Sequence, residues 1–250
     1  MFFMKIKLLG KNLDDIRPLL EKFDLIECDK DFELVITHGG DGALLGAERD
    51  YPGIPKFPLR DAATASPCEQ HPAEVRLREL ISGKAKEFVL PKVAARANGK
   101  EIIALNDVFI HNFERASALR YRVFIDGELY AHEIVGDGVC LSSVHGSSAY
   151  YRSITQSLFK VGIGLAFSNS TEDVNHLVLS EKSKICIEIV RGPGLIIADN
   201  SPDYETVAVG ETVELYQTDK TATILGLDGF MCKQCRLLRH PHKHPFAGMI

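Results

Sequence analysis

Residues 33–49 read ELVITHGGDGALLGAER, and this stretch decides the fold of the N-terminal part of the chain. The apolar run ELVIT is typical of a buried strand, and ALLGAER has the pattern of a helix. A glycine turn at residues 38–42 joins the two. Glycines at such a junction let the backbone approach a phosphate closely, and the start of a helix favours negative charge. The stretch therefore predicts an α/β layer with a phosphate-binding turn.

Asp41 is unexpected inside a simple phosphate-binding turn, because its carboxylate would repel the phosphate. It has a purpose if it contacts a divalent cation or accepts a proton from an attacking hydroxyl group. A tight turn with a helix-capping aspartate is the alternative.

The segments on either side extend this pattern. Residues 3–9 predict a strand, residues 12–23 a helix that Pro18 delays or kinks, and residues 72–82 another helix. From about residue 86, short apolar runs alternate with turn signals, which is typical of antiparallel strands. Strands are expected at 102–105, 119–125, 128–135, 139–142, 184–190, 194–198, 212–217 and 221–227, with a helical patch near 147–159. We expect an α/β N-terminal domain over 1–95, a β-rich, sandwich-like domain over 96–228 and a basic Cys/His-containing tail over 229–250.

Composition narrows the classes of function. The chain has 250 residues and a net charge of −5, which argues against nucleic acid as a partner. No apolar run is long enough for a membrane helix, so we expect no membrane partner and a cytoplasmic location. Of the six cysteines, only Cys232 and Cys235 are closely spaced. Because the chain has no export signal, we expect the other four to be reduced and mostly buried.

Two later motifs carry polar side chains suited to a nucleotide. Asn106-Asp107 ends a strand-like run and has the donors and acceptors to grip a ribose diol. Residues 137–150, DGVCLSSVHGSSAY, lead from a strand through a loop of small hydroxyl residues into a helix. A polar turn and a serine-capped helix are the alternatives.

Taken in order, GGDG, the Asn-Asp pair and DGVCLSSVHGSSAY resemble the NAD kinase family. That family shows GGDGT, an NE or ND pair and a DG-x-x-x-STPTGSTAY stretch. The resemblance is clearest over residues 31–49 and 101–153. It implies the fold of that family, a dinucleotide-binding role for the β-rich domain, and transfer of the terminal phosphoryl group of ATP to the adenosine-ribose 2′-hydroxyl of NAD. Mg²⁺ or another divalent cation would assist, and we expect a homodimer or homotetramer.

The resemblance also implies roles for the matching residues. Asp41 would be the general base, and Gly39, Gly40 and Gly42 would let the ATP phosphates come near. Asp137 would lie near the nicotinamide end of NAD. The full set of residues implied to contact NAD is Asn106, Asp107, Asp137, Ser148, Ala149, Tyr150 and Ser153.

Several positions depart from the family pattern. Ala43 stands where the family usually has Thr, and Val144-His145 replaces Pro-Thr or Pro-Ser. PKFPLRD at 55–61 stands where a Gly-rich stretch is usual, and the SAGGPI-like segment is missing after Tyr150. Two alternatives follow: a related GGDG-type lipid kinase, and a non-catalytic NAD- or nucleotide-binding protein.

The tail offers a separate prediction. Cys232 and Cys235 have the spacing of a zinc-binding pair and are followed by His240, His242 and His244. A solvated basic tail is the alternative.

Overall fold

The computed structural model describes residues 3–64, 67–114, 116–173 and 175–239. The chain forms two compact units. The first joins the N-terminal residues up to Leu90 with the described residues from Ala222 onward, and the second runs from Pro91 to Thr221. The end of the chain thus packs with its beginning, whereas the sequence predicts three consecutive segments.

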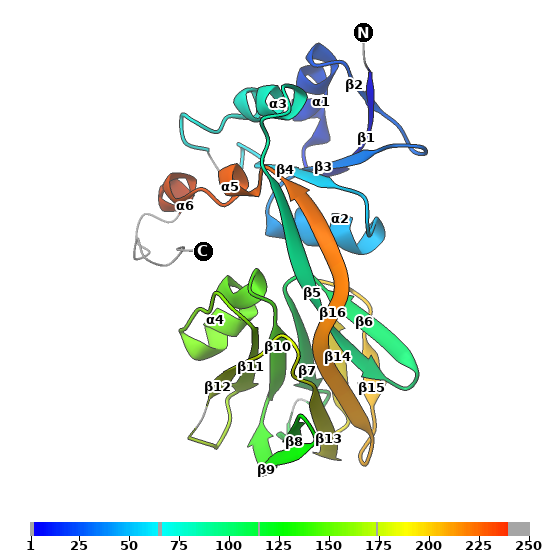
Figure 1. Cartoon of the computed structure of the whole chain (residues 1–250), viewed down its shortest axis with the longest axis vertical. Coiled ribbons are helices and arrows are strands. Elements are labelled where there is room, and N and C mark those ends of the chain that lie inside the picture. The colour runs from blue at the N-terminus through cyan, green and yellow to red at the C-terminus, as the bar shows by residue number, and fades with distance from the viewer. Residues whose placement is uncertain (1–2, 65–66, 115, 174, 240–250) are drawn as a thin grey trace. The chain divides into compact units, whose positions relative to one another are not determined.

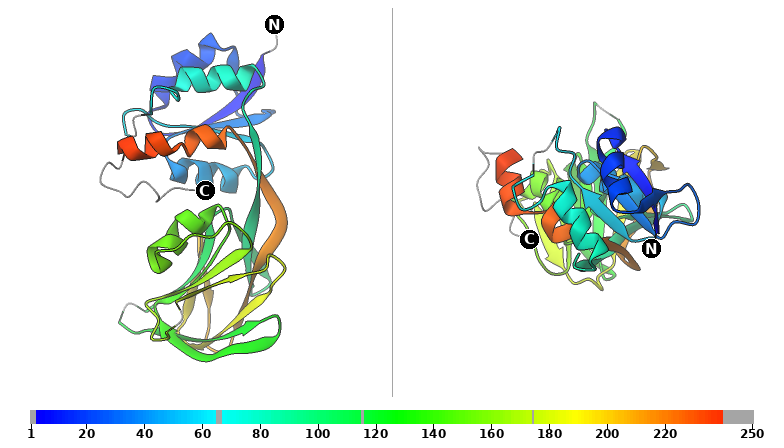
Figure 2. Two further views of the ribbon diagram at one scale, coloured as in Figure 1. Left: turned by 60° about the vertical axis from the view of Figure 1, so that its left-hand side comes forward. Right: turned by 90° about the horizontal axis from the view of Figure 1, so that it is seen from above.

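The first unit is a parallel sheet with helices on both faces (Figure 1). Its strand order is β2-β1-β3-β4-β16. Its elements are β1 (Met4–Gly10), α1 (Leu13–Lys22), β2 (Leu25–Glu27), β3 (Leu34–His38), α2 (Asp41–Asp50), β4 (Lys56–Leu59), α3 (Ala73–Ile81), the last residues of β16 (Thr212–Leu225), α5 (Leu227–Phe230) and α6 (Lys233–Arg239). Figure 2 shows α5 and α6, in orange and red, beside these layers.

The core of the first unit follows from the alternation of its strands. Ile6 and Leu8 of β1 pair in parallel with Leu34 and Ile36 of β3, and these four buried side chains share one face. Buried residues of α1 and α3 complete that cluster, whereas α2 covers the opposite face (Figure 1). Helix α1 continues through Pro18, whose side chain is exposed.

The second unit consists of antiparallel strands in two sheets. One has the order β12-β11-β10-β7-β14-β15, and the other contains β16-β13-β8-β9 with the hairpin β5-β6 beside β16. Its elements are β5 (Glu87–Ala97), β6 (Lys100–Ala104), β7 (Asp107–Asn112), β8 (Leu119–Ile125), β9 (Glu128–Gly136), β10 (Gly138–Ser142), the 3₁₀ helix η1 (Gly146–Ser148), α4 (Tyr150–Thr155), β11 (Ile163–Ser168), β12 (His176–Leu179), β13 (Ile185–Arg191), β14 (Gly194–Ala198), β15 (Glu205–Val207) and most of β16.

Facing side chains of both sheets form one apolar core, which includes Ile110 and Leu141 from one sheet and Tyr121 and Ile187 from the other. The predicted fold class, an α/β part followed by a β-rich sandwich, is confirmed. None of the helices in the described part of the chain has the length and hydrophobicity that a bilayer-spanning helix needs.

Two local predictions are wrong. The runs at 212–217 and 221–227 form one long strand, β16, because residues 218–220 stay extended and carry the chain from the second unit back to the first. The predicted helix near 147–159 is broken. Ala149 has a φ of −95° and a ψ of −120°, so η1 ends before it and α4 begins only at Tyr150.

Candidate functional site

The glycine turn connects β3 to α2, as the sequence predicts. Gly39 has a φ of 151°, and a Cβ added there would lie 3.2 Å from the Cβ of Ala43, so glycine is required. Gly40 is the N-cap residue, and α2 starts at Asp41. The partial positive charge of the helix N-terminus therefore lies at the turn, where it suits a phosphate group.

Asp41 is the first residue of α2, and the N-cap position before it is the glycine Gly40, which has no side chain to cap the helix. The Asp41 side chain is 65% exposed, and its Oδ1 accepts a hydrogen bond from Nη2 of Arg60 at 3.1 Å. The Arg60 side chain is only 10% exposed, and its guanidinium lies 3.6 Å from the centroid of the Phe230 ring. It also donates to the carbonyl oxygen of Phe230. An exposed carboxylate and a firmly held cation thus meet at the turn.

The loop after β4, which contains Arg60, is braced by the buried Asp61. The Asp61 carboxylate accepts hydrogen bonds from the Ala63 amide, the Thr64 hydroxyl and the Asn12 side chain, at 3.0, 3.0 and 2.9 Å. Burial alone would raise the pKa of Asp61, but these hydrogen bonds outweigh it and lower the pKa below its ordinary value. Asp61 therefore stays ionised and fixes the backbone next to Arg60.

In the second unit, Asn106 and Asp107 stand where the chain enters β7. The carboxylate of Asp199, just after β14, accepts hydrogen bonds from three successive backbone amides, those of Leu105, Asn106 and Asp107, at 2.8, 2.7 and 3.2 Å. Asp199 thus sets the backbone of the Asn-Asp pair. The sequence gives no local signal for this role, because Asp199 reaches the pair only through the pairing of β7 with β14.

Asp107 is a buried acid with a perturbed pKa. Burial and then the charge of Asp199 raise the pKa of Asp107 to about 7, although a hydrogen bond from the Tyr150 amide opposes the shift. Burial also raises the pKa of Asp199, against the three amides that bind it. The Tyr150 amide links the Asn-Asp pair directly to the start of α4, so two sequence motifs meet at one place.

Asn106 contributes an unsatisfied polar atom at this place. Its Oδ1 is buried and has no hydrogen-bond partner in the part of the chain that the structure describes. A buried polar atom left unpaired costs roughly 1–3 kcal/mol, so it needs an explanation. The neighbouring backbone is close-packed: a Cβ at Gly146 would lie 2.1 Å from the Asn106 carbonyl oxygen, and Ser143 donates from its amide to that oxygen at 2.8 Å.

A strip of aromatic side chains continues from Asp107 along the outer face of β7. Phe109 and His111 follow Asp107 at alternate positions, and their ring centroids lie 3.7 Å apart. Tyr150, which is 45% exposed, packs edge-on against Phe109 with a centroid distance of 5.0 Å. Phe109 is buried, whereas the rings of His111 and Tyr150 are at least partly exposed and suit contact with a nucleotide base.

Asp137 lies at the far end of this strip. Strand β10 pairs with β7 so that Ser142 is opposite Asp107 and Gly138 is opposite His111. At a strand rise of about 3.4 Å per residue, the Cα atoms of Asp137 and Ser142 are separated by about 17 Å. Asp137 is exposed, and its Oδ2 accepts a hydrogen bond from Asn169 at 2.6 Å. It is therefore outside the immediate surroundings of the Asn-Asp pair.

The small residues around α4 differ in placement from the expected continuous helix. Ser148 ends η1 and is half-buried, whereas Ala149 is exposed and lies between the two helices. Ser153 is exposed, and its hydroxyl donates to the Tyr150 carbonyl at 2.7 Å. Its neighbour Tyr151 is fully buried and anchors α4 on the sheet.

The tail cysteines lie in the first unit. Cys232 precedes α6 and Cys235 is inside it, and both approach Cys68 and His71. His240, His242 and His244 lie outside the described residues.

No protein-family model matches the chain. The chain is 30% identical to an NAD kinase of Clostridium beijerinckii over 149 residues. The aligned region covers 56% of this chain and 52% of that protein. The crystal structure of an NAD kinase from Archaeoglobus fulgidus in complex with ATP superimposes with a TM-score of 0.73 at 16% identity, over 91% of this chain and 96% of that one. The crystal structure of yeast NADH kinase complexed with NADH superimposes with a TM-score of 0.76 at 17% identity, over 97% of this chain and 89% of that one.

The chain is similar in sequence to curated NAD kinases, and it has the fold of the two solved kinase structures. The resemblance drawn from the three motifs is thereby confirmed, and so is the fold it implies. The chain spans about half the length of the curated relatives that it matches.

Two residues of the candidate site lie outside the three sequence motifs. Arg60 belongs to PKFPLRD, the stretch that replaces the Gly-rich segment of the family, and it supplies the cation beside Asp41. Asp199 organises the Asn-Asp pair from a distant strand. The sequence does offer a hint for Arg60, because this arginine directly follows the apolar run that forms β4, the neighbour of β3.

Proposed function

We propose that this chain is an NAD kinase that transfers the terminal phosphoryl group of ATP to the adenosine-ribose 2′-hydroxyl of NAD and forms NADP. Its similarity to curated NAD kinases, and to solved structures of an NAD kinase and an NADH kinase with the same fold, supports the proposal. The observation that carries it is in the second unit. Oδ1 of Asn106 is buried and unpaired among the described residues, beside an Asp107 that is tied to the start of α4.

The second unit is proposed to bind the acceptor. Asn106 and Asp107 would hold a ribose, since an unpaired carbonyl oxygen and a carboxyl group are natural partners for its hydroxyl groups. His111 and Tyr150, whose rings pack against the buried Phe109, would contact the flat parts of the dinucleotide. A strip about 17 Å long suits an extended ligand with two ends rather than a mononucleotide. Asp137 would then meet the nicotinamide end, with Ser148, Ala149 and Ser153 along the side.

The first unit is proposed to supply the phosphoryl-transfer groups. Asp41 would accept the proton of the attacking hydroxyl group, for which its exposed carboxylate is suitable. Gly39, Gly40 and Gly42 would let the phosphates approach the α2 N-terminus. Arg60 would add positive charge near the transferred group, a contribution that grows where water is excluded.

The glycine turn offers one protein ligand, the Asp41 carboxylate, for a divalent cation such as Mg²⁺. This carboxylate is exposed, and one of its oxygens already accepts a hydrogen bond from Arg60. Mg²⁺ commonly binds through one or two carboxylates together with substrate phosphates and water, so one carboxylate is sufficient for a cation that arrives with ATP. When bound, the cation would neutralise phosphate charge.

The direct experiment is to incubate the purified chain with NAD, ATP and Mg²⁺ and to quantify NADP by an NADP-specific dehydrogenase. Parallel reactions replace NAD by NADH and ATP by polyphosphate, and chain-free mixtures serve as blanks. We expect NADP formation that depends on the protein. Binding of NAD without turnover at any donor concentration would instead identify a non-catalytic NAD-binding protein, and phosphorylation of diacylglycerol or a sphingoid base would identify a lipid kinase. Light scattering of the same sample tests for a homodimer or homotetramer.

A further inference from the structure

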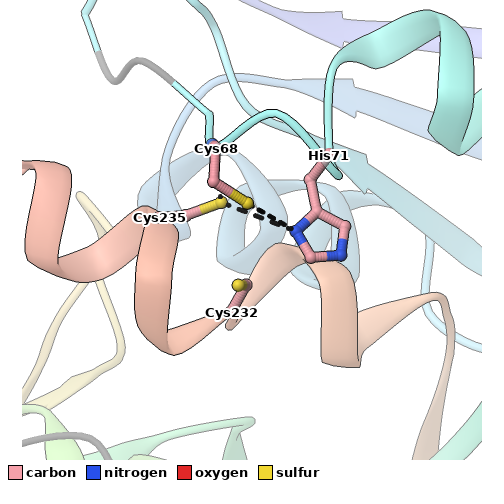
Figure 3. Close-up of side chains that lie close together, drawn as sticks. All are labelled: Cys68, His71, Cys232 and Cys235. Carbon is pink, nitrogen blue, oxygen red and sulfur yellow. Dashed lines mark hydrogen bonds between the residues drawn. The ribbon is translucent and has the colours of Figure 1, made fainter.

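Four potential metal ligands from opposite ends of the chain meet in the first unit (Figure 3). Cys68 and His71 come from the loop before α3, and Cys232 and Cys235 come from the segment that contains α6. The three sulfur atoms and a ring nitrogen all lie within 4.8 Å of one another. The glycine turn and the Asn-Asp pair do not involve any of these four residues.

The spacing inside the cluster is that of a tetrahedral metal site. Sγ of Cys68 and Sγ of Cys235 lie 3.2 and 3.7 Å from Nδ1 of His71. Zinc bonds of about 2.3 Å to sulfur and about 2.0 Å to nitrogen at tetrahedral angles place two sulfurs about 3.8 Å apart and a sulfur and a nitrogen about 3.6 Å apart. The observed distances lie close to these values, so a zinc ion requires only small side-chain adjustments.

The backbone around the cluster also has the features of a metal-binding turn. Each pair of ligands is separated by two residues, as Cys68-x-x-His71 and Cys232-x-x-Cys235. The backbone amide of Cys68 donates to Sγ of Cys235 at 3.2 Å, and the amides of Gln70 and His71 are directed at the Cys68 sulfur. Amide donors of this kind hold ligating sulfur in place and offset its negative charge.

We propose that Cys68, His71, Cys232 and Cys235 bind one structural Zn²⁺ ion. Three sulfurs and one imidazole form a complete ligand set, so the site is closed and leaves no position for a substrate. Cys68 is 8% exposed and Cys235 is 1% exposed, which fits a structural rather than a catalytic metal. The proposal does not depend on kinase activity. It gives the Cys232–Cys235 pair an imidazole partner in His71, a residue far from it in the sequence.

A disulfide is the competing account of so many close sulfurs. A disulfide would join two of the three cysteines, and it would not explain why the third sulfur and the His71 ring lie beside them. All six cysteines are free thiols in the structure. A zinc ion uses all four side chains, and it explains why the ring nitrogen of His71 points at two sulfurs (Figure 3).

The zinc ion would fasten the end of the chain to the α/β unit. Phe230, which holds the guanidinium of Arg60, lies two residues before Cys232. Fixing Cys232 and Cys235 to the loop before α3 therefore also fixes the Phe230 contact with Arg60. Metal removal should loosen this segment first, because the metal closes a loop of about 160 residues.

The test measures metal content of the full chain, expressed without a histidine tag and purified in reductant. The matched variants are Cys68→Ser, Cys232→Ser and His71→Ala, and Cys186→Ser, a half-buried cysteine of the second unit, is the control. We expect one zinc per chain in the wild type and in Cys186→Ser, and at least a tenfold loss of bound zinc in the three variants. Cobalt exchanged into the wild type should give the thiolate charge-transfer and d–d bands of a tetrahedral site with sulfur ligands.

Two results would overturn the proposal. One is a reduced, folded wild type that binds neither zinc nor cobalt in stoichiometric amount. The other is full metal content in the three cluster variants. If a variant fails to fold, measurements on the wild type alone test the proposal. Chelation should lower its melting temperature, and added zinc should restore it. Limited proteolysis of the chelated protein should cut first after residue 226. A chelator-resistant melting temperature counts against the site.

Discussion

Arg60 donates a hydrogen bond from Nη2 to Oδ1 of Asp41 at 3.1 Å, so the carboxylate of the glycine turn already has a cationic partner. Arg60 is held on its other side by the ring and the carbonyl oxygen of Phe230. Its side chain is nearly buried, and a buried guanidinium without these partners would be costly. The position of the cation is therefore set by the fold and not by Asp41 alone. This arrangement makes the chemistry of the turn testable by small changes at Asp41.

Asp41→Asn should lower turnover by about 10²–10⁴-fold, because the amide cannot accept the proton of the attacking hydroxyl group. The amide oxygen can still accept the hydrogen bond from Arg60. Since the Asp41 side chain is exposed and the amide keeps its hydrogen bond with Arg60, the melting temperature should stay unchanged. Steady-state NADP formation and a thermal melt of the same preparation check both parts. Asp50→Asn, at the other end of α2, is the control, and turnover close to wild type in Asp41→Asn would remove the general-base role.

Asn106→Ala should weaken NAD binding by about 5- to 150-fold, the equivalent of roughly 1–3 kcal/mol, and leave ATP binding nearly unchanged. The reason is that Oδ1 of Asn106 is buried without a partner among the described residues, so its removal costs the free protein little. Calorimetric titration with each nucleotide provides the comparison. Asn98→Ala is the control. Asn98 lies in an exposed turn, where its side chain donates a hydrogen bond to the Thr206 carbonyl oxygen, and the substitution should change the binding of neither nucleotide. Equal losses for NAD and ATP would contradict an acceptor-binding role.

Asp107 should make the stability of the fold depend on pH. Burial, followed by the charge of Asp199, raises its folded-state pKa to about 7, above an unfolded-state value of about 3.9. Between these values the unfolded chain has released the proton and the folded chain still holds it. This contribution to the free energy of unfolding is therefore complete at low pH and is lost as the pH rises towards 7, at up to about 1.4 kcal/mol per pH unit.

Asp107→Asn isolates that effect, since the amide resembles the protonated acid and can still accept from the Tyr150 amide. Urea unfolding of both proteins between pH 5 and pH 9 measures the difference in free energy. The stability of the wild type relative to Asp107→Asn should fall up to about pH 7 and then level off. Asp199 takes part in the same titration because burial raises its pKa too. A difference that is constant across the range would show that Asp107 is ionised throughout.

Ala149→Leu should abolish or strongly reduce NAD binding while the melting temperature stays nearly constant. Ala149 is exposed and lies between η1 and α4, so the added bulk meets no core side chain and should avoid the overpacking cost of about 1–3 kcal/mol. Thermal melts with and without NAD separate the two effects. Ala131→Leu, on β9 of the same unit, is a size-matched control at a position that packs against the core, and it should show the lower melting temperature that overpacking produces. Retained NAD affinity with a lower melting temperature would assign Ala149 to packing.

Local pattern in the sequence determined much of this protein. The strand, glycine turn and helix over residues 33–49 follow from hydrophobic periodicity and from the backbone that Gly39 requires. The hairpin around Asp126-Gly127 follows from its turn residues in the same way. The order of three short motifs was sufficient to indicate the family, because each motif is contiguous in the chain.

Only the tertiary structure decided which distant residues meet. Arg60 reaches Asp41 because β4 lies beside β3, and Asp199 reaches the Asn-Asp pair because β14 lies beside β7. Cys68 and His71 approach Cys232 and Cys235 because β16 returns the chain to the first unit. Strand pairing between remote segments leaves no periodic trace in either segment. For that reason the sequence determined the elements and their motifs, and the pairing of the strands decided the partners of Asp41, Asn106 and the tail cysteines.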